Sequence, residues 1–177
     1  MLLSNILATP QLLLVLSTLA ASSSDQCATP PEYDALQFLE TFKDGYVALT
    51  SFYNYDECTL LNRTTLSNDN TTAEYVVMAR KRDQTNLTTY KVSFKTEACS
   101  SKVDITYADN NVMHITLAYA QYGKCAVFQD DSNPDECVLY AYTDATDDEF
   151  NACSEHFPSN CDKELWRSLG PQQCKDG

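Results

Sequence analysis

Apolar and polar side chains alternate along much of the chain between Gly45 and Asp144, in short runs that polar turns separate. The alternation is clearest over residues 90–95, 103–107 and 113–119. A period of two residues gives a β-strand one apolar face and one polar face. No ten-residue stretch of this region has the period of a helix, so we expect an antiparallel β domain.

Turn-forming residues separate eight such runs in meander order. Eight is the number of strands at which an up-and-down sheet closes into a barrel around one small ligand. A two-sheet sandwich is the competing architecture, but its crossovers need long connections, and the connections here are short and even. We therefore predict an all-β fold, an eight-stranded antiparallel up-and-down barrel. The predicted strands are Tyr46–Phe52, Cys58–Thr64, Glu74–Lys81, Thr89–Glu97, Lys102–Ala108, Val112–Gln121, Cys125–Gln129 and Cys137–Thr143.

A short helix is predicted before the first strand, over residues 34–42, because Leu36, Leu39 and Phe42 fall on one helical stripe. Downstream of the last strand, Asp147 or Asp148 is expected to cap a second helix.

Pro158 is expected to end that second helix, and a shorter helix is predicted from Leu165 to Gly170. A meander barrel with a short N-terminal helix and a C-terminal helix is the plan of a lipocalin.

The first 24 residues carry no charge and surround the apolar run 12–16, which is followed by the small residues 20–24. The run is too short to span a bilayer as a membrane anchor, although no Lys or Arg precedes it. We therefore predict a signal peptide over residues 1–24 and one lipocalin domain over residues 25–177, secreted to the extracellular space.

Eight cysteines spread over the predicted domain without any Cys-x-x-Cys spacing, which favours four disulfides over a zinc site. Eight cysteines allow 105 connectivities. The three Asn-x-Ser/Thr sequons at Asn62, Asn70 and Asn86 are predicted glycosylation sites. We expect residues 62–72 to form a surface loop, since they are polar.

The net charge of -13 disfavours nucleic acid and anionic membrane surfaces as partners. Catalysis finds little support because the only histidines, His114 and His156, belong to no triad or zinc motif. The acidic clusters at residues 130–131 and 147–149 lack the spacing of a calcium loop. We predict a monomeric binding protein without enzymatic activity, cofactor or metal.

The segment from Cys27 through Asp34-Ala-Leu-Gln and Gly45-Tyr46-Val47 to Cys58 is similar in residue type and spacing to the start of tick salivary lipocalins. The C-terminal layout is also similar. By that resemblance Cys58 pairs with Cys174, while Cys125 and Cys27 compete for Cys153. Three further cysteines have no counterpart in the family pattern, and their pairing stays open: Cys99, Cys137 and Cys161.

Family members that bind biogenic amines carry a Cys-Asp-Val/Ile/Leu motif and a Glu-Leu-Trp/Tyr motif. The equivalent stretches here read Cys125-Ala126-Val127 and Val138-Leu139-Tyr140. Both carboxylates are absent, and an alkylammonium buried without a counter-ion carries a large desolvation cost. Glu136 could serve only if the strand register slipped, and a slip of one residue would turn its side chain to the opposite face. Histamine or serotonin is therefore the less favoured ligand.

The remaining prediction is an apolar lumen that suits a sterol or a fatty-acid-like ligand, with tyrosine hydroxyls as its few polar points. A barrel filled by these same side chains is the alternative. The predicted lining residues are Tyr46, Met78, Tyr90, Val92, Phe94, Ile105, Tyr107, Ile115, Leu117, Phe128, Tyr140 and Tyr142, with Leu39 near the mouth.

The resemblance implies a sterol such as cholesterol as ligand and suppression of host immunity, including dendritic-cell maturation. One alternative is a scavenger of leukotriene or thromboxane, whose carboxylate needs a lumen cation. Alternation places the available Arg80, Lys91 and Lys95 outward. A second alternative is an interaction module that binds a complement component or a host immune-cell receptor through the aromatic-rich loop 51–57.

Overall fold

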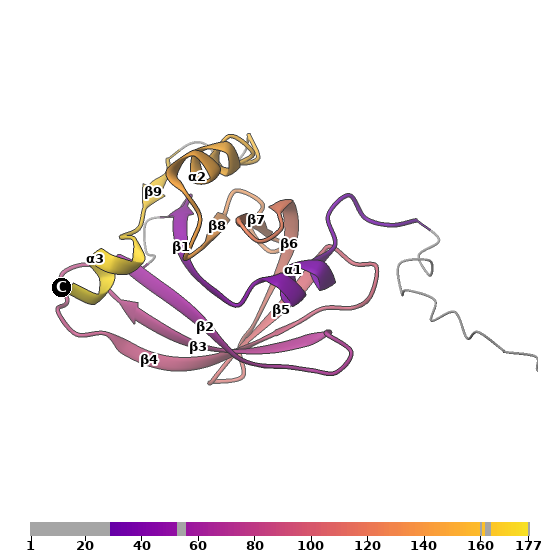
Figure 1. Ribbon diagram of the computed structural model, residues 1–177, viewed down its shortest axis with the longest axis horizontal. Coiled ribbons are helices and arrows are strands. Elements are labelled where there is room, and N and C mark those ends of the chain that lie inside the picture. Colours follow the sequence, from indigo (N-terminus) through magenta and orange to yellow (C-terminus); the bar gives the residue numbers. More distant parts are fainter. Residues whose placement is uncertain (1–28, 53–55, 160, 162–163, 177) are drawn as a thin grey trace, which may run out of the picture.

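The structure is a computed structural model and describes residues 29–52, 56–159, 161 and 164–176. Its strands are hydrogen-bonded in the order β2-β3-β4-β5-β6-β7-β8-β1-β9, and β1 also pairs with β2, which closes an eight-stranded antiparallel barrel (Figure 1). The elements are α1 Ala35–Thr41, β1 Asp44–Thr50, β2 Cys58–Leu66, β3 Thr72–Arg80, β4 Thr88–Lys95, β5 Lys102–Tyr107, β6 Val112–Gln121, β7 Cys125–Asp130, β8 Cys137–Tyr142, α2 Asp147–Ser154, β9 Trp166–Arg167 and α3 Pro171–Asp176.

The predicted fold class is confirmed, and each of the eight predicted strands is present with ends that differ by at most two residues. Closure excludes the sandwich, because β1 has a hydrogen-bonded neighbour on both sides. The predicted loop over residues 62–72 is wrong. Strands β2 and β3 run through most of it and pair from Cys58–Arg80 to Leu66–Ala73, so that only the five residues between them form a turn.

Three register shifts change which face of a strand points into the barrel. They lie between Val47 and Leu49 in β1, between Arg63 and Thr65 in β2, and between Leu117 and Tyr119 in β6. The extra residue in β6 turns Tyr119 to the outside, where its ring stacks on His156 with centroids 3.8 Å apart. The uninterrupted alternation of β6 in the sequence therefore breaks at the bulge.

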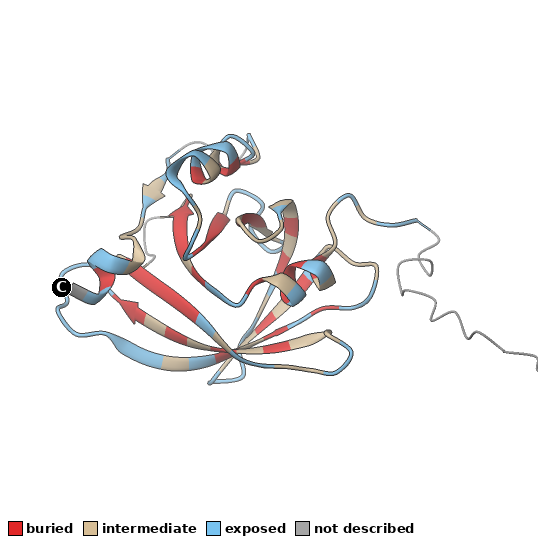
Figure 2. Ribbon diagram, in the orientation of Figure 1, coloured by how far each residue is buried: buried red, intermediate tan, exposed pale blue. Residues whose placement is uncertain are grey.

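The apolar side chains form one cluster inside the barrel and two smaller clusters on its outer surface. The outer clusters lie beneath α2, β9 and α3, which we call the C-terminal segment (Figures 1 and 2). Strands β1 and β8 are accordingly buried on both faces, and every residue of β8 is buried.

The C-terminal segment differs from its prediction in two places. Thr146, rather than Asp147 or Asp148, caps α2, in a capping box with Glu149. Residues 166–167 form the short strand β9 on β1 instead of a helix, and a helix begins only at Pro171.

The buried stripe of α1 also differs, since Leu36 is only partly buried. The stripe consists of Ala35, Phe38, Leu39 and Phe42, which keeps the spacing i, i+3, i+4, i+7. Among the described residues, no helix is both long enough and apolar enough to cross a membrane.

Candidate ligand-binding site

Helix α1 closes one end of the barrel and inserts its apolar stripe into the lumen. The ring of Phe38 stacks on Phe42 at 4.8 Å between centroids and meets Phe128 edge-on at 4.9 Å. Tyr140 contacts Phe42 and Phe128 in the middle of the barrel, at 5.9 and 5.7 Å. These edge-to-face contacts build what we call the aromatic plug, which fills the closed half of the lumen. Its members are Phe38, Phe42, Tyr75, Phe94, Phe128 and Tyr140.

Hydrogen bonds fix the polar groups around the plug. The Tyr75 hydroxyl donates to the Phe42 carbonyl at 2.8 Å, and burial raises the pKa of this phenol. The Tyr142 hydroxyl lies 2.8 Å from the Thr41 hydroxyl. The Arg63 guanidinium donates to the Leu39 carbonyl at the C-terminal end of α1. A carbonyl group in the last turn of α1 thus accepts a hydrogen bond from a cation, which the helix dipole favours.

Gly45 of β1 is required by the same packing. A Cβ at this position would lie 2.2 Å from Cε2 of Phe42 and 2.7 Å from the Ala141 carbonyl oxygen. We expect Gly45→Ala to lower the free energy of unfolding by about 1–3 kcal/mol, because the plug or the backbone has to shift. Urea unfolding measures this loss. The control is Gly170→Ala, whose Cβ would meet its nearest neighbour at 3.8 Å. Equal losses in the two variants would contradict the packing argument.

The other half of the lumen, which we call the open-end chamber, lies at the barrel end opposite α1. In this structure it encloses a cavity of about 20 Å³. That volume holds about one water molecule. The filled-barrel alternative therefore describes the lumen of this structure, and the expected hollow lumen is not present in it. The chamber is lined by Thr59, Leu61, Val77, Tyr90, Val92, Phe94, Ile105, Tyr107 and Tyr140.

Two tyrosines fill the chamber, and few side-chain hydrogen bonds fix them. Tyr90 and Tyr107 are only partly buried, and the only hydrogen bond of the Tyr107 hydroxyl within the described residues is a long contact of 3.9 Å to Met113 Sδ. Burial raises the pKa of Tyr90 to about 12, with the nearby charge of Asp56 adding to the effect. Burial also raises the pKa of Tyr107, with Asp130 adding. Both phenols therefore stay neutral at physiological pH and can donate hydrogen bonds.

Thr59 contributes a polar group that the chamber leaves unsatisfied. Its side chain is buried, and its Oγ1 has no hydrogen-bond partner among the described residues. A buried hydroxyl without a partner costs about 1–3 kcal/mol. The chamber thus offers one hydrogen-bonding group that a hydroxyl-bearing molecule could satisfy.

The structure brings most of the predicted lining residues together inside the barrel. The interior cluster contains Leu39, Val92, Phe94, Ile105, Ile115, Leu117, Phe128, Tyr140 and Tyr142, with Tyr90 and Tyr107 packed against it. Leu39 belongs to α1 and lies at the closed end, not near the mouth. Whether any of these residues binds a ligand stays a prediction.

Tyr46 and Met78 were assigned to the wrong face of their strands. Both pack against the outer clusters beneath the C-terminal segment. Gly45 has no side chain that could mark the inward face of β1. The alternation in the sequence therefore does not show whether Tyr46 or Val47 faces the lumen. In β3 the inward residues are Ala73, Tyr75, Val77 and Ala79. The polar residues at the alternate positions of this strand, such as Glu74, indicate that the other face points outward.

The positions where amine binders carry carboxylates do face the lumen. Ala126 and Val138 both belong to the interior cluster. The three cations considered for an eicosanoid do not: Lys91 and Lys95 are exposed, and Arg80 lies near Glu57 on the outside, with Nε 3.8 Å from Oε2. Arg63 is an inward cation that the prediction missed. Its guanidinium is already engaged, because it donates to the Leu39 carbonyl of α1. Among the described residues, no cluster of three or more His, Cys, Asp or Glu could hold a metal ion.

Three disulfides fasten the C-terminal segment to the barrel. Cys58–Cys174 confirms the pairing that the resemblance implied, and Cys125–Cys153 decides the competition for Cys153. The third is Cys137–Cys161. Cys99 is also disulfide-bonded, and Cys27 lies outside the described residues.

The fold and the closed, helix-capped barrel define a protein with the lipocalin fold. Neither a family model nor a curated protein matches the chain. Among solved structures, Japanin from Rhipicephalus appendiculatus bound to cholesterol is similar, with a TM-score of 0.56 and 11% identity over 78% of this chain and 98% of that one.

A serotonin complex of AM182 gives a TM-score of 0.53 and 12% identity over 82% of this chain and 95% of that one. Lobster apocrustacyanin A1 gives a TM-score of 0.56 and 11% identity over 76% of this chain and 79% of that one. At these identities the likeness establishes the fold and not the ligand.

Proposed function

We propose that this chain is a secreted lipocalin-type binding protein that holds a small, uncharged hydrophobic molecule in the open-end chamber. A sterol such as cholesterol is the favoured ligand. The observation that carries the proposal is the chamber wall, which combines apolar side chains with hydroxyl groups and has no ionised side chain among its described lining residues. The hydroxyls of Thr59, Tyr90 and Tyr107 are available to form hydrogen bonds with the single hydroxyl of a sterol.

The rim of the chamber disfavours a ligand carboxylate. Asp56 acts on the Tyr90 phenol, and Asp109 and Asp130 act on the Tyr107 phenol, so three acidic groups lie near the two tyrosines. Like charges at a low-dielectric mouth repel an entering anion. Arg63, the inward cation identified among the described residues, is engaged by α1 beyond the aromatic plug. Fatty acids and eicosanoids are therefore the weaker candidates.

An amine is the second candidate that this rim favours. Asp56 is partly buried, which raises the pKa of its carboxyl group, and it lies close to Tyr90. A protonated amine at the mouth would pair with Asp56, but the lumen itself offers Ala126 and Val138 where an amine needs carboxylates. The uncharged ligand is preferred for that reason.

A sterol requires the chamber to open. Drug-sized ligands occupy pockets of roughly 300–1,000 Å³, whereas the chamber encloses about 20 Å³. Rotation of Tyr90 and Tyr107 toward solvent is the least costly way to gain that space, since neither ring belongs to the hydrogen-bonded plug. In a ligand-bound crystal structure we expect both rings to have moved and the plug to be unchanged.

The cellular part of the proposal is a secreted role in the host. Removal of residues 1–24 as a signal peptide and glycosylation at the three sequons belong to it. The side chains of Asn62 and Asn86 are exposed, and the Asn70 amide donates to Glu40 at 2.7 Å. Suppression of host immunity, including dendritic-cell maturation, is the proposed outcome of binding. A module that binds a host immune-cell receptor or a complement component is the alternative. The residues Tyr53 and Tyr55, predicted to contact such a partner, lie outside the described residues.

Native mass spectrometry of protein secreted from animal cells tests the proposal, followed by solvent extraction and identification of the released molecule. A stoichiometric sterol supports it. If the released molecule is a fatty acid, an eicosanoid or an amine such as serotonin, that molecule replaces the sterol as the proposed ligand. Protein that arrives empty and takes up no added lipid overturns lumen binding.

Val92→Trp is expected to weaken cholesterol binding at least tenfold. Val92 is 3% exposed on the inward face of β4 and lines the chamber, so an indole there occupies the ligand's place. The control is Lys91→Trp, which puts the same indole on the exposed outer face of that strand. Thermal unfolding checks that both variants fold. Cholesterol binding that is unchanged in folded Val92→Trp would locate the ligand outside the chamber.

A further inference from the structure

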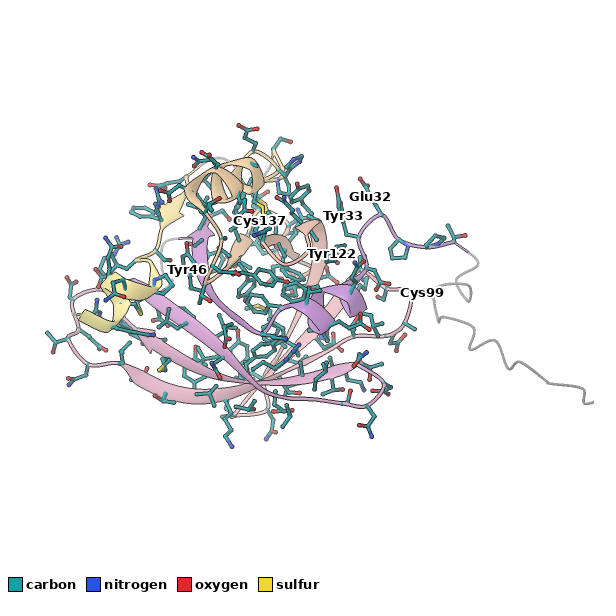
Figure 3. The ribbon with its side chains drawn as sticks, in the orientation of Figure 1. Glu32, Tyr33, Tyr46, Cys99, Tyr122 and Cys137 are labelled. Carbon is teal, nitrogen blue, oxygen red and sulfur yellow. A yellow bond between two sulfur atoms is a disulfide. The ribbon has the colours of Figure 1, made fainter. Side chains whose placement is uncertain are left out.

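A second cavity, larger than the open-end chamber, lies outside the barrel. It is a cleft of about 510 Å³ between β1, α2 and the chain that links β9 to α3. This volume falls within the usual range for small-molecule sites. In Figure 3, Tyr46 lies between β1 and the C-terminal segment, where it forms part of the cleft floor. We call this cavity the outer cleft.

Covalent and hydrogen-bonded links hold the walls of the outer cleft in place. Cys125–Cys153 fixes α2 to β7, and Cys58–Cys174 fixes α3 to β2. Strand β9 pairs with β1 through Leu49 and Arg167. A site whose walls are already ordered loses little conformational entropy on binding.

The floor contains apolar and aromatic side chains among polar ones. Ala48, Phe150 and Leu169 contribute side chains to it, together with the ring of Tyr46. The Arg167 guanidinium lies over the Phe150 ring, 4.7 Å from its centroid. That stacking directs the cation to the edge of the cleft and orders its planar fork of donors.

Two opposite charges line the cleft without pairing with each other. Asp147 and Arg167 are both exposed, and neither forms a salt bridge within the described part of the chain. Both act on Tyr46, whose pKa is raised by burial, lowered by Arg167 and raised by Asp147. The phenol therefore stands within the electrostatic reach of a cation and an anion, and its hydroxyl has no hydrogen-bond partner among the described residues.

We infer that the outer cleft is a second ligand site, which takes a zwitterionic molecule with an apolar body. Its ammonium group pairs with Asp147, its carboxylate or phosphate with Arg167, and its apolar part lies against Leu169 and the ring of Tyr46. The Tyr46 hydroxyl bonds to the ligand between the two charges. A free aromatic amino acid and the headgroup of a single-chain phosphocholine lipid share this chemistry. The site is independent of the open-end chamber, because its floor is the outer face of β1.

Isothermal titration calorimetry with two probes tests the inference: L-phenylalanine, and a six-carbon lysophosphatidylcholine below its micelle concentration. We expect one or both to bind, and the binding probe identifies the source of the chemistry. Arg167→Gln and Asp147→Asn should each weaken binding at least tenfold, and Tyr46→Phe should weaken it severalfold. The uncharged N-acetyl-L-phenylalanine amide should not bind.

Two controls separate this site from the chamber. Val92→Trp, which blocks the chamber, should keep the affinity for the zwitterionic probe, and Arg167→Gln should keep the affinity for cholesterol. Asp147 and Arg167 are exposed, so both variants are expected to fold, and thermal unfolding checks this. The inference is overturned if neither probe binds at millimolar concentration, if the three cleft substitutions leave binding unchanged, or if binding is lost only in Val92→Trp.

Discussion

Replacing Phe42 by alanine is expected to lower the free energy of unfolding by about 3–5 kcal/mol, the usual cost of truncating a buried aromatic side chain. Phe42 is fully buried at the end of α1 and contacts Phe38, Tyr75, Tyr140 and Tyr142. Since those rings are themselves packed against one another, the space cannot collapse and a cavity remains. Urea unfolding followed by circular dichroism measures the loss.

Leu87→Ala is the control for this prediction, because Leu87 is 37% exposed and its truncation should cost less than about 0.5 kcal/mol. A loss below about 1 kcal/mol in Phe42→Ala would mean that the plug repacks around the missing ring. The closed half of the lumen would then be adaptable, and a ligand could extend deeper than the open-end chamber.

The double variant Cys58→Ser/Cys174→Ser is expected to lose about 4–5 kcal/mol of stability. The bridge spans a sequence separation of 116 residues, and its removal frees the denatured chain to sample far more conformations. The loss is measured by denaturant unfolding of the folded variant under non-reducing conditions. The C-terminal segment should also lose protection from hydrogen exchange, because α3 is then held to β2 only by packing.

Cys137→Ser/Cys161→Ser provides the matched comparison, since that bridge spans only 24 residues. Its expected loss is about 3–4 kcal/mol, roughly 1 kcal/mol less than for the long bridge. A larger loss for the short bridge would show that native packing around Cys161 outweighs loop entropy.

Much of the fold could be predicted from the chain because strand alternation is a local property. Each strand buries one face, and the period of two residues marks that face wherever it is uninterrupted. This signal identified the inward orientation of Val92, Phe94 and Ile105. The absent carboxylates at Ala126 and Val138 were also read correctly as lumen positions.

The two lining residues placed on the wrong face share one physical source, which is burial on the outer face. Strands β1 and β3 carry apolar residues on both sides because the C-terminal segment covers part of the barrel. Alternation then no longer distinguishes inside from outside, and Tyr46 and Met78 were placed in the lumen. The bulge in β6 limits alternation for a different reason, because one extra residue reverses the face of Tyr119.

The sequence by itself determined the class of fold, the order of the strands, the lack of lumen carboxylates and the eight cysteines that make a bridged C-terminal segment possible. The tertiary structure alone decided how full the lumen is, because the packing of rings from α1, β3, β4, β7 and β8 depends on side chains far apart in the chain. It also decided that Tyr46, Asp147 and Arg167 meet in the outer cleft. Local periodicity fixes which face of an element is apolar, but only closure of the barrel and docking of the C-terminal segment determine what that face meets.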